Sequence, residues 1–204
     1  GNASNLEISK NGTAVELVYV DSTTGWQSVA TANTNDILNP FVVASGGTET
    51  TCGDFKIHTF TSPGTFTVSN GGTASGSNTV SYMVVAGGAG GGSAEGGGGG
   101  AAGGFRESKA STDTYTASPL NATSGPGYNL PVTAQAYPIT VGAGGSAGNR
   151  TSPTCRAGNN GSNSVFSTIT SAGGGGGGGG ASVGNSGKDG GAGGGGGEDN
   201  GSPG

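Results

Sequence analysis

The sequence predicts an all-β protein, in which short β-rich N-terminal modules precede a glycine-rich domain of bundled polyglycine-II helices and short strands, with essentially no α-helix. The chain contains 49 glycines in 204 residues, with an unbroken run of eight at 173–180. Short stretches of β-branched and aromatic residues, separated by turn signals, are typical of strands. Only 30% of the residues are hydrophobic, so either much of the chain is disordered or backbone hydrogen bonds order it.

Residues 1–40 form the first expected unit, a β-rich trunk-like module. Leu6 and Ile8 alternate with polar residues, Asn11-Gly12 is a hairpin turn signal, and an apolar stretch follows at 14–20. A second turn precedes Trp26, where a strand resumes. Short strands of this kind cannot close a core alone, so we expect a homotrimer with four residues among those buried: Val15, Leu17, Tyr19 and Trp26.

Residues 41–85 form the second expected unit, a module of hairpins and strands. Strands are expected at 55–60 and 65–68, on either side of the turn Ser62-Pro63-Gly64. The stretch 80–85 is the most apolar of this module, and we expect it to be a strand buried on both faces.

Residues 86–204 form the glycine-rich domain, in which short β-branched strands lead into glycine runs. This order repeats at 83–85, 138–141 and 165–170. We expect the runs 86–104, 173–180 and 193–197 to be extended helices with three residues per turn, lying side by side and joined by backbone hydrogen bonds. Flexible linkers and silk-like stacked sheets are the alternatives, whereas collagen would need glycine at every third position.

Two loop inserts, at 105–137 and 148–164, interrupt this domain and carry the side chains best suited to recognition. The second insert also holds Asn159 and Asn160. The candidate receptor contacts are Arg106, Lys109, Tyr115, Tyr128, Tyr137, Asn149, Arg150 and Arg156. Capping of the bundle is the structural alternative for both inserts.

Charge and motif content exclude several function classes. A net charge of −5 argues against nucleic-acid binding, and no apolar run is long enough for membrane insertion. His58 is the only histidine and has no credible catalytic partner, so we expect no enzymatic activity, no metal and no cofactor. A disulfide between Cys52 and Cys155 would stabilise the fold by about 4–5 kcal/mol in the chain-entropy model, and two free thiols are the alternative.

Several stretches carry a family resemblance. Residues 1–12, 15–21 and Gly25-Trp26 resemble a short β-module in structural fibre proteins of marine tailed bacteriophages, notably those that infect cyanobacteria. Residues 82–88, 103–108, 137–144 and 163–169 resemble the glycine-rich domain common in such fibres. The resemblance implies a trimeric fibre or tail-fibre adhesin on the virion surface. Its partners would be other virion proteins and a host receptor, either a glycan or an outer-membrane protein.

Two other functions are open at this stage. The chain also fits a secreted or cell-surface filament-forming protein, in which the glycine domain is pure scaffold. An ice-binding protein is the third alternative, although the glycine runs contain almost no threonine. The ends of the chain lie inside a β-module and a Gly/Ser stretch, so we expect a piece of a longer polypeptide.

Overall fold

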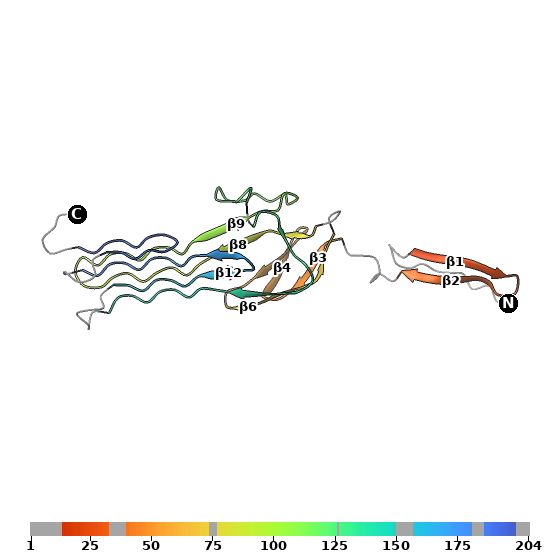
Figure 1. Ribbon diagram of the computed structural model, residues 1–204, viewed down its shortest axis with the longest axis horizontal. Helices are drawn as coiled ribbons and strands as arrows, with labels where there is room; N and C mark the ends of the chain where they lie inside the picture. Colours follow the sequence, from red (N-terminus) through yellow and green to blue (C-terminus); the bar gives the residue numbers. More distant parts are fainter. Residues whose placement is uncertain are drawn as a thin grey trace.

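The computed structural model describes residues 14–32, 40–73, 77–125, 127–149, 157–180 and 186–198. Every regular element within these ranges is a β-strand, which confirms the all-β prediction. Figure 1 shows the glycine-rich runs extending from one end of the sheets, with the β1–β2 hairpin at the opposite end of the molecule. Since the described residues contain no helix, none is available to cross a membrane.

Strands β1 (Ala14–Asp21) and β2 (Gly25–Ala32) form an antiparallel hairpin. The Asp21 carboxylate closes its turn by accepting bonds from the Thr23 and Thr24 N–H groups at 2.8 and 2.5 Å, and these bonds lower the pKa of Asp21. The predicted strand at residues 6–10 lies outside the described residues. Of the residues predicted to be buried in a trimer, Tyr19 and Trp26 are 52% and 65% exposed in the single chain.

The main sheet has five antiparallel strands in the order β13-β12-β11-β6-β3. Because β6 pairs with β11, the sheet is continuous across the module boundary expected after Val85. Its strands are β3 (Val42–Ser45), β6 (Gly64–Gly71), β11 (Ala136–Thr140), β12 (Ser164–Phe166) and β13 (Ile169–Ser171). Residues 165–170 were expected to be one strand, but they form a hairpin that turns at Ser167, where φ is +54°.

Three smaller antiparallel pairs complete the sheet structure. They are β4 (Thr48–Cys52) with β5 (Phe55–Thr59), β7 (Thr79–Val80) with β10 (Leu130–Pro131), and β8 (Tyr82–Val85) with β9 (Phe105–Ser108). The prediction that 80–85 is buried on both faces is wrong. Met83 and Val85 are 66% and 51% exposed, while Tyr82 and Val84 pack against the core.

The hydrophobic core lies where these strands meet, and its buried residues are Phe66, Val68, Leu130, Val132, Tyr137, Phe166 and Ile169. Aromatic rings pack edge-to-face within it, with the Phe166 ring centroid 5.9 Å from that of Phe66 and 6.1 Å from that of Tyr137. Tyr137, expected to be a receptor contact, is therefore a core residue. Its hydroxyl bonds the backbone of Thr133, and its ring is not available to a receptor.

Candidate functional site: the glycine bundle and its insert

The glycine-rich part folds into a bundle of extended runs. We number them along the chain: first (86–93), second (97–104), third (141–149), fourth (158–163), fifth or central (172–180), sixth (186–191) and seventh (192–198). Backbone hydrogen bonds join the runs laterally. The predicted runs at 173–180 and 193–197 therefore lie side by side as ordered segments. The stretch 86–104 was expected to be one extended run, but it forms two antiparallel runs joined by a turn at 94–96, where Ala94 and Gly96 have φ values of +76° and +72°.

The hydrogen bonds repeat every three residues, as expected for a polyglycine-II helix with three residues per turn. N–H groups of the first run donate to carbonyls of the second, from Ala86 to Gly104, Ala89 to Ala101 and Gly92 to Gly98, at 3.0, 2.8 and 2.8 Å. Carbonyls of the first run accept hydrogen bonds from N–H groups of the central run at the same three-residue spacing, from Gly174 to Gly87, Gly177 to Gly90 and Gly180 to Ser93. The first run therefore bonds to the second run through one row of residues and to the central run through another.

The central run is surrounded by other runs, and all eight of its glycines are buried. It is hydrogen-bonded to every other described run except the third. Seven consecutive carbonyls, from Ala172 to Gly178, each accept a backbone N–H. An added Cβ at Gly176 or Gly177 would collide with the carbonyl oxygen of Gly158 or Gly98, respectively. Only glycine fits at these two positions.

Two asparagines of the fourth run complete the bonding of the central run. Asn163 Oδ1 accepts the Gly173 N–H and Asn160 Oδ1 accepts the Gly176 N–H, both at 2.9 Å. Asn160 Nδ2 also donates to the Asp189 carbonyl at 2.8 Å, which joins the fourth run to the sixth. At two successive turns of the central run, these side-chain amides accept the hydrogen bonds that carbonyls of a neighbouring run would otherwise accept. Their spacing of three residues is the signal that would have identified them.

The structure corrects the prediction that residues 148–164 form a loop insert. Residues 158–163 are a run of the bundle rather than a loop, because Gly158 and Gly161 donate backbone bonds to Gly177 and Gly174. Among the candidate contacts of this insert, Asn149 is exposed at the end of the third run. Arg150 and Arg156 lie outside the described residues.

The first insert, 105–137, begins and ends in strands, and its middle forms the loop beside β8 and β9 in Figure 1. Lys109 braces this loop, since its Nζ donates to the carbonyls of Asp113 and Tyr115 at 3.1 Å each. The same Nζ lies 5.6 Å from the Tyr115 ring centroid. The Tyr115 ring packs edge-to-face on Phe55, and burial raises the pKa of its hydroxyl.

Further side chains fasten this loop to β9. The Glu107 carboxylate accepts bonds from the N–H and hydroxyl of Ser118, and Asn121 Oδ1 accepts the Lys109 N–H at 2.7 Å. Of the candidate contacts in this insert, the structure brings only Lys109 and Tyr115 together. Arg106 is exposed on β9, and Tyr128 is half-buried near the end of the loop.

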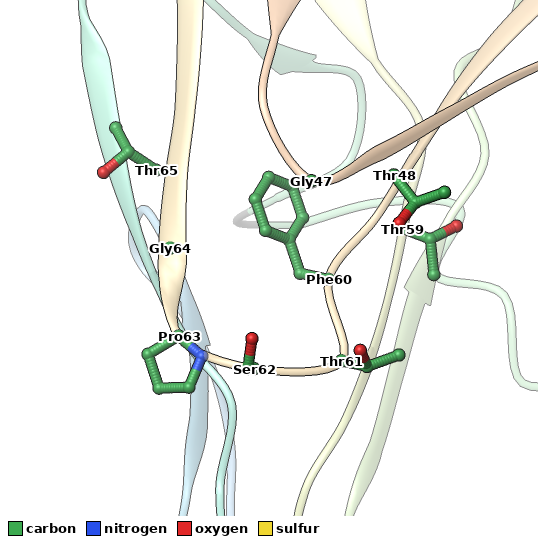
Figure 2. Close-up of a pocket in the computed structure, with 9 residues that line it drawn as sticks. All are labelled: Gly47, Thr48, Thr59, Phe60, Thr61, Ser62, Pro63, Gly64 and Thr65. Atoms are coloured by element: carbon green, nitrogen blue, oxygen red, sulfur yellow. The ribbon is translucent and has the colours of Figure 1, made fainter.

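A separate hollow of about 270 Å³ lies between the start of β4 and the β5–β6 loop. Figure 2 shows the Phe60 ring standing inside the loop formed by Thr61, Ser62 and Pro63. Hydroxyl-bearing residues and glycines line the remainder.

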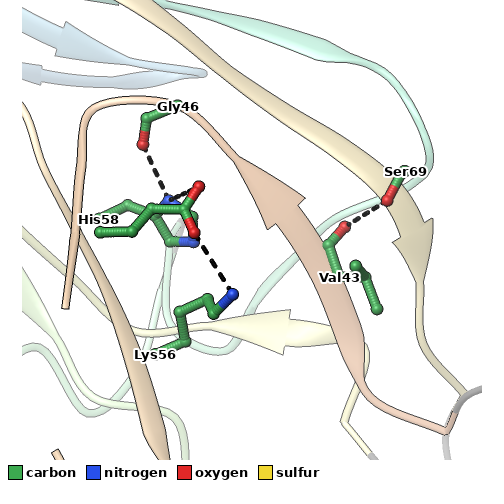
Figure 3. A network of polar contacts seen from close by, with 6 residues as sticks. Val43, Gly46, Lys56, His58 and Ser69 are labelled. Atoms are coloured by element: carbon green, nitrogen blue, oxygen red, sulfur yellow. Dashed lines mark hydrogen bonds and ion pairs between the residues drawn. The ribbon is translucent and has the colours of Figure 1, made fainter. Parts of the chain in front are cut away.

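A polar cluster supports the turn beside this hollow (Figure 3). His58 Nδ1 lies 2.9 Å from the Gly46 carbonyl oxygen, and the His58 ring packs edge-to-face on Phe66. Glu49 lies 4.0 Å from His58 and 3.3 Å from Lys56, and the Lys56 hydrogen bond lowers the pKa of Glu49. His58 is thus a packing residue that holds the backbone.

The described residues also include one of the two cysteines. Cys52 is exposed at the end of β4, and Cys155 lies outside the described residues, so the disulfide stays a prediction. In the part of the chain that the structure describes, no three His, Cys, Asp or Glu residues are grouped to hold a metal ion.

Comparison with known proteins identifies the family. Residues 60–204 match the family model described as a glycine-rich domain, so the match includes four of the five strands of the main sheet, β6, β11, β12 and β13, as well as the bundle. No curated protein matches the chain, and no solved structure does. Because the match covers most of the 204 residues, the chain belongs to the glycine-rich domain family.

Proposed function

We propose that this chain is a structural segment of a virion surface fibre or tail-fibre adhesin, which displays loops for attachment to a host cell. The observation that carries the proposal is the bundle, whose central run is bonded through its backbone to five other runs. Such a scaffold is stiff and elongated and offers few side chains of its own, so recognition falls to the segments displayed on it.

The β1–β2 hairpin supports the trimeric part of the proposal. A two-stranded hairpin is marginally stable alone in water. Here it exposes Val18, Tyr19, Val20 and Trp26 at 44%, 52%, 53% and 65%. Three copies packed through these side chains would bury the apolar area that one hairpin leaves exposed.

Sedimentation equilibrium tests the trimer, with an expected mass three times that of one chain. Replacing Tyr19 and Trp26 together with serine should shift the protein to monomer. Replacing the polar turn residue Thr23 with serine is the matched control and should leave the trimer intact. A wild-type protein that remains monomeric would contradict this part of the proposal.

Competition for adsorption tests the attachment function. Purified protein, added to cyanobacterial cells before tailed cyanophages, should reduce phage adsorption, and antibodies against it should label the fibres of the virion by electron microscopy. The inserts are tested by replacing Tyr115, Tyr128 and Arg150 with alanine. Unchanged competition by a variant that still assembles would assign the receptor contacts to another part of the fibre.

The bracing of the first insert favours a second candidate function, a filament-forming scaffold on a cell surface or in its secretions. Lys109, Glu107 and Asn121 direct their polar groups inward to the loop itself, as in a segment that caps the bundle. Under this alternative, the purified protein forms filaments visible by negative-stain microscopy, and it leaves phage adsorption unchanged.

A further inference from the structure

We propose that the hollow around Phe60 is a binding site for a neutral sugar ring, one hexose unit in size. The inference rests on the proposed function in attachment and places a ligand site outside both inserts. The volume of about 270 Å³ lies just below the range of about 300–1,000 Å³ typical of small-molecule sites. A single sugar ring fits that size better than a larger ligand does.

The lining of the hollow selects for a neutral polyol. None of its residues carries a charge, and five carry hydroxyl groups: Thr48, Thr59, Thr61, Ser62 and Thr65. Figure 2 shows the Thr59 and Thr65 side chains projecting away from the Phe60 ring, so the loop residues Thr61 and Ser62 supply the hydroxyls for a ligand on the ring. Each hydroxyl offers one donor and two acceptor positions, as does each hydroxyl of a sugar. An anion or a cation would find no opposite charge here, so it would lose its hydration without compensation.

The Phe60 ring supplies the apolar surface that a sugar ring also needs. Its edges lie against two glycines, since a Cβ at Gly47 or Gly64 would come within 3.1 or 3.2 Å of ring carbons. Larger residues at these positions would displace or cover the ring. The negative face of an aromatic ring attracts the weakly positive C–H groups of a sugar face. Figure 2 shows the Ser62 hydroxyl turned toward this ring from the loop.

The walls of the hollow are held in place without a ligand. Gly46 and Gly47 have φ values of +112° and +67°, and the Gly46 carbonyl is bonded to His58. On the facing side, Thr48 and Thr59 are paired in the β4–β5 ladder. A preformed site avoids the entropic cost of ordering its walls on binding, which suits a weak ligand such as a single hexose.

NMR titration of the ¹⁵N-labelled protein with D-glucose, D-galactose and D-mannose tests the site. At least one hexose should shift the amide signals of Thr48, Thr59 and Ser62 at about 10 mM, ten times a millimolar dissociation constant. Glucuronate and glucosamine should bind more weakly than the neutral sugars. Absence of shifts in these amides with all three hexoses would overturn the proposal.

Variants make the test specific to the hollow. Replacing Ser62 with alanine removes the hydroxyl that is turned toward the Phe60 ring, and it should weaken binding about tenfold. Thr51→Val, on β4 but outside the hollow, is the control and should bind as the wild type does. Thr61→Ala, also in the loop, serves as a second variant should the Ser62 replacement prevent folding. Equal binding by the folded hollow variants and the control would also overturn the proposal.

Phage adsorption, measured separately, distinguishes this site from the attachment function. A protein that blocks adsorption but shows no hexose shift contradicts the sugar site alone. A protein that binds hexose in the hollow but leaves adsorption unchanged supports the sugar site and contradicts attachment.

Discussion

The central and fourth runs of the bundle have the same extended backbone, yet their sequences differ sharply. The central run has glycine at every position from 173 to 180, whereas the fourth run reads Gly158-Asn159-Asn160-Gly161-Ser162-Asn163. All eight glycines of the central run are buried, and neighbouring runs surround it. The fourth run has neighbours on one side only, so its glycines face inward and its polar residues are exposed.

This difference shows that the number of neighbours, rather than the helix type, decides where glycine is required. An inward Cβ on the fourth run, at Gly158 or Gly161, would collide with a carbonyl of the first run. The third run follows the same rule with Gly142 and Gly145, where a Cβ would collide with the fourth run. Glycine at every third residue is therefore sufficient at the edge of the bundle but not at its centre.

The largest effect is expected for Gly177→Val in the central run. Its side chain would enter a space bounded by backbone of the first and second runs, and neither can move without breaking its own bonds. We expect a loss of about 4 kcal/mol or more in the free energy of unfolding, measured by thermal denaturation. Gly99→Ala is the control, since no atom lies within 4 Å of its added Cβ. Equal melting of the two variants would contradict the close-packed bundle.

Gly161→Ala should have a smaller, still unfavourable effect. The added methyl would meet the Gly87 carbonyl, but the fourth run lies at the edge and can move outward to relieve the contact. We expect a loss of about 2 kcal/mol in the free energy of unfolding. Ser162→Ala, one residue along on the exposed side, should change stability by less than about 0.5 kcal/mol. If both variants melted alike, the inward orientation of Gly161 would be wrong.

Asn160→Ala tests the side chains that take the place of a neighbouring run. It leaves the buried Gly176 N–H without its acceptor, which should cost about 1–2 kcal/mol and accelerate hydrogen exchange of that amide. Asn159→Ala is the matched control, because the Asn159 amide bonds only the exposed Ser146 hydroxyl at 2.8 Å. Unchanged exchange at Gly176 in the Asn160 variant would show that water replaces the amide without penalty.

Much of the fold could be predicted from the sequence because its signals are local. The solid glycine runs and the strands near 14–20, 55–59 and 82–85 were expected, and the structure confirms them. Backbone pairing explains this success: a residue without a side chain, repeated many times, permits few ordered arrangements other than close lateral packing.

The errors came from residues whose role depends on distant neighbours. The fourth run was expected to be a loop because Asn and Ser between glycines are typical of loops, and only its position at the bundle edge explains them. Tyr137 was expected on a binding surface, but pairing of β11 with β6 places it beside Phe66 in the core. The hollow around Phe60 depends on a turn after β3 approaching the β5–β6 loop, which no local pattern indicates.

The smallest effect, and one of opposite sign, is expected for Gly144→Ala in the third run. Only one atom, the Gly88 carbonyl oxygen at 3.6 Å, lies near its added Cβ, which is ordinary contact, and Gly144 does not have a positive φ. Alanine restricts the unfolded chain more than glycine does, so the free energy of unfolding should rise by about 0.4–1 kcal/mol. Gly145→Ala, the next residue, is the matched control: its Cβ would collide with the Asn159 carbonyl, so it should destabilise the protein. Thermal melting of this adjacent pair gives the sharpest test of the comparison, because the same substitution should move the midpoint in opposite directions. Two shifts of the same sign would mean that the third run does not hold a fixed rotation against its neighbours.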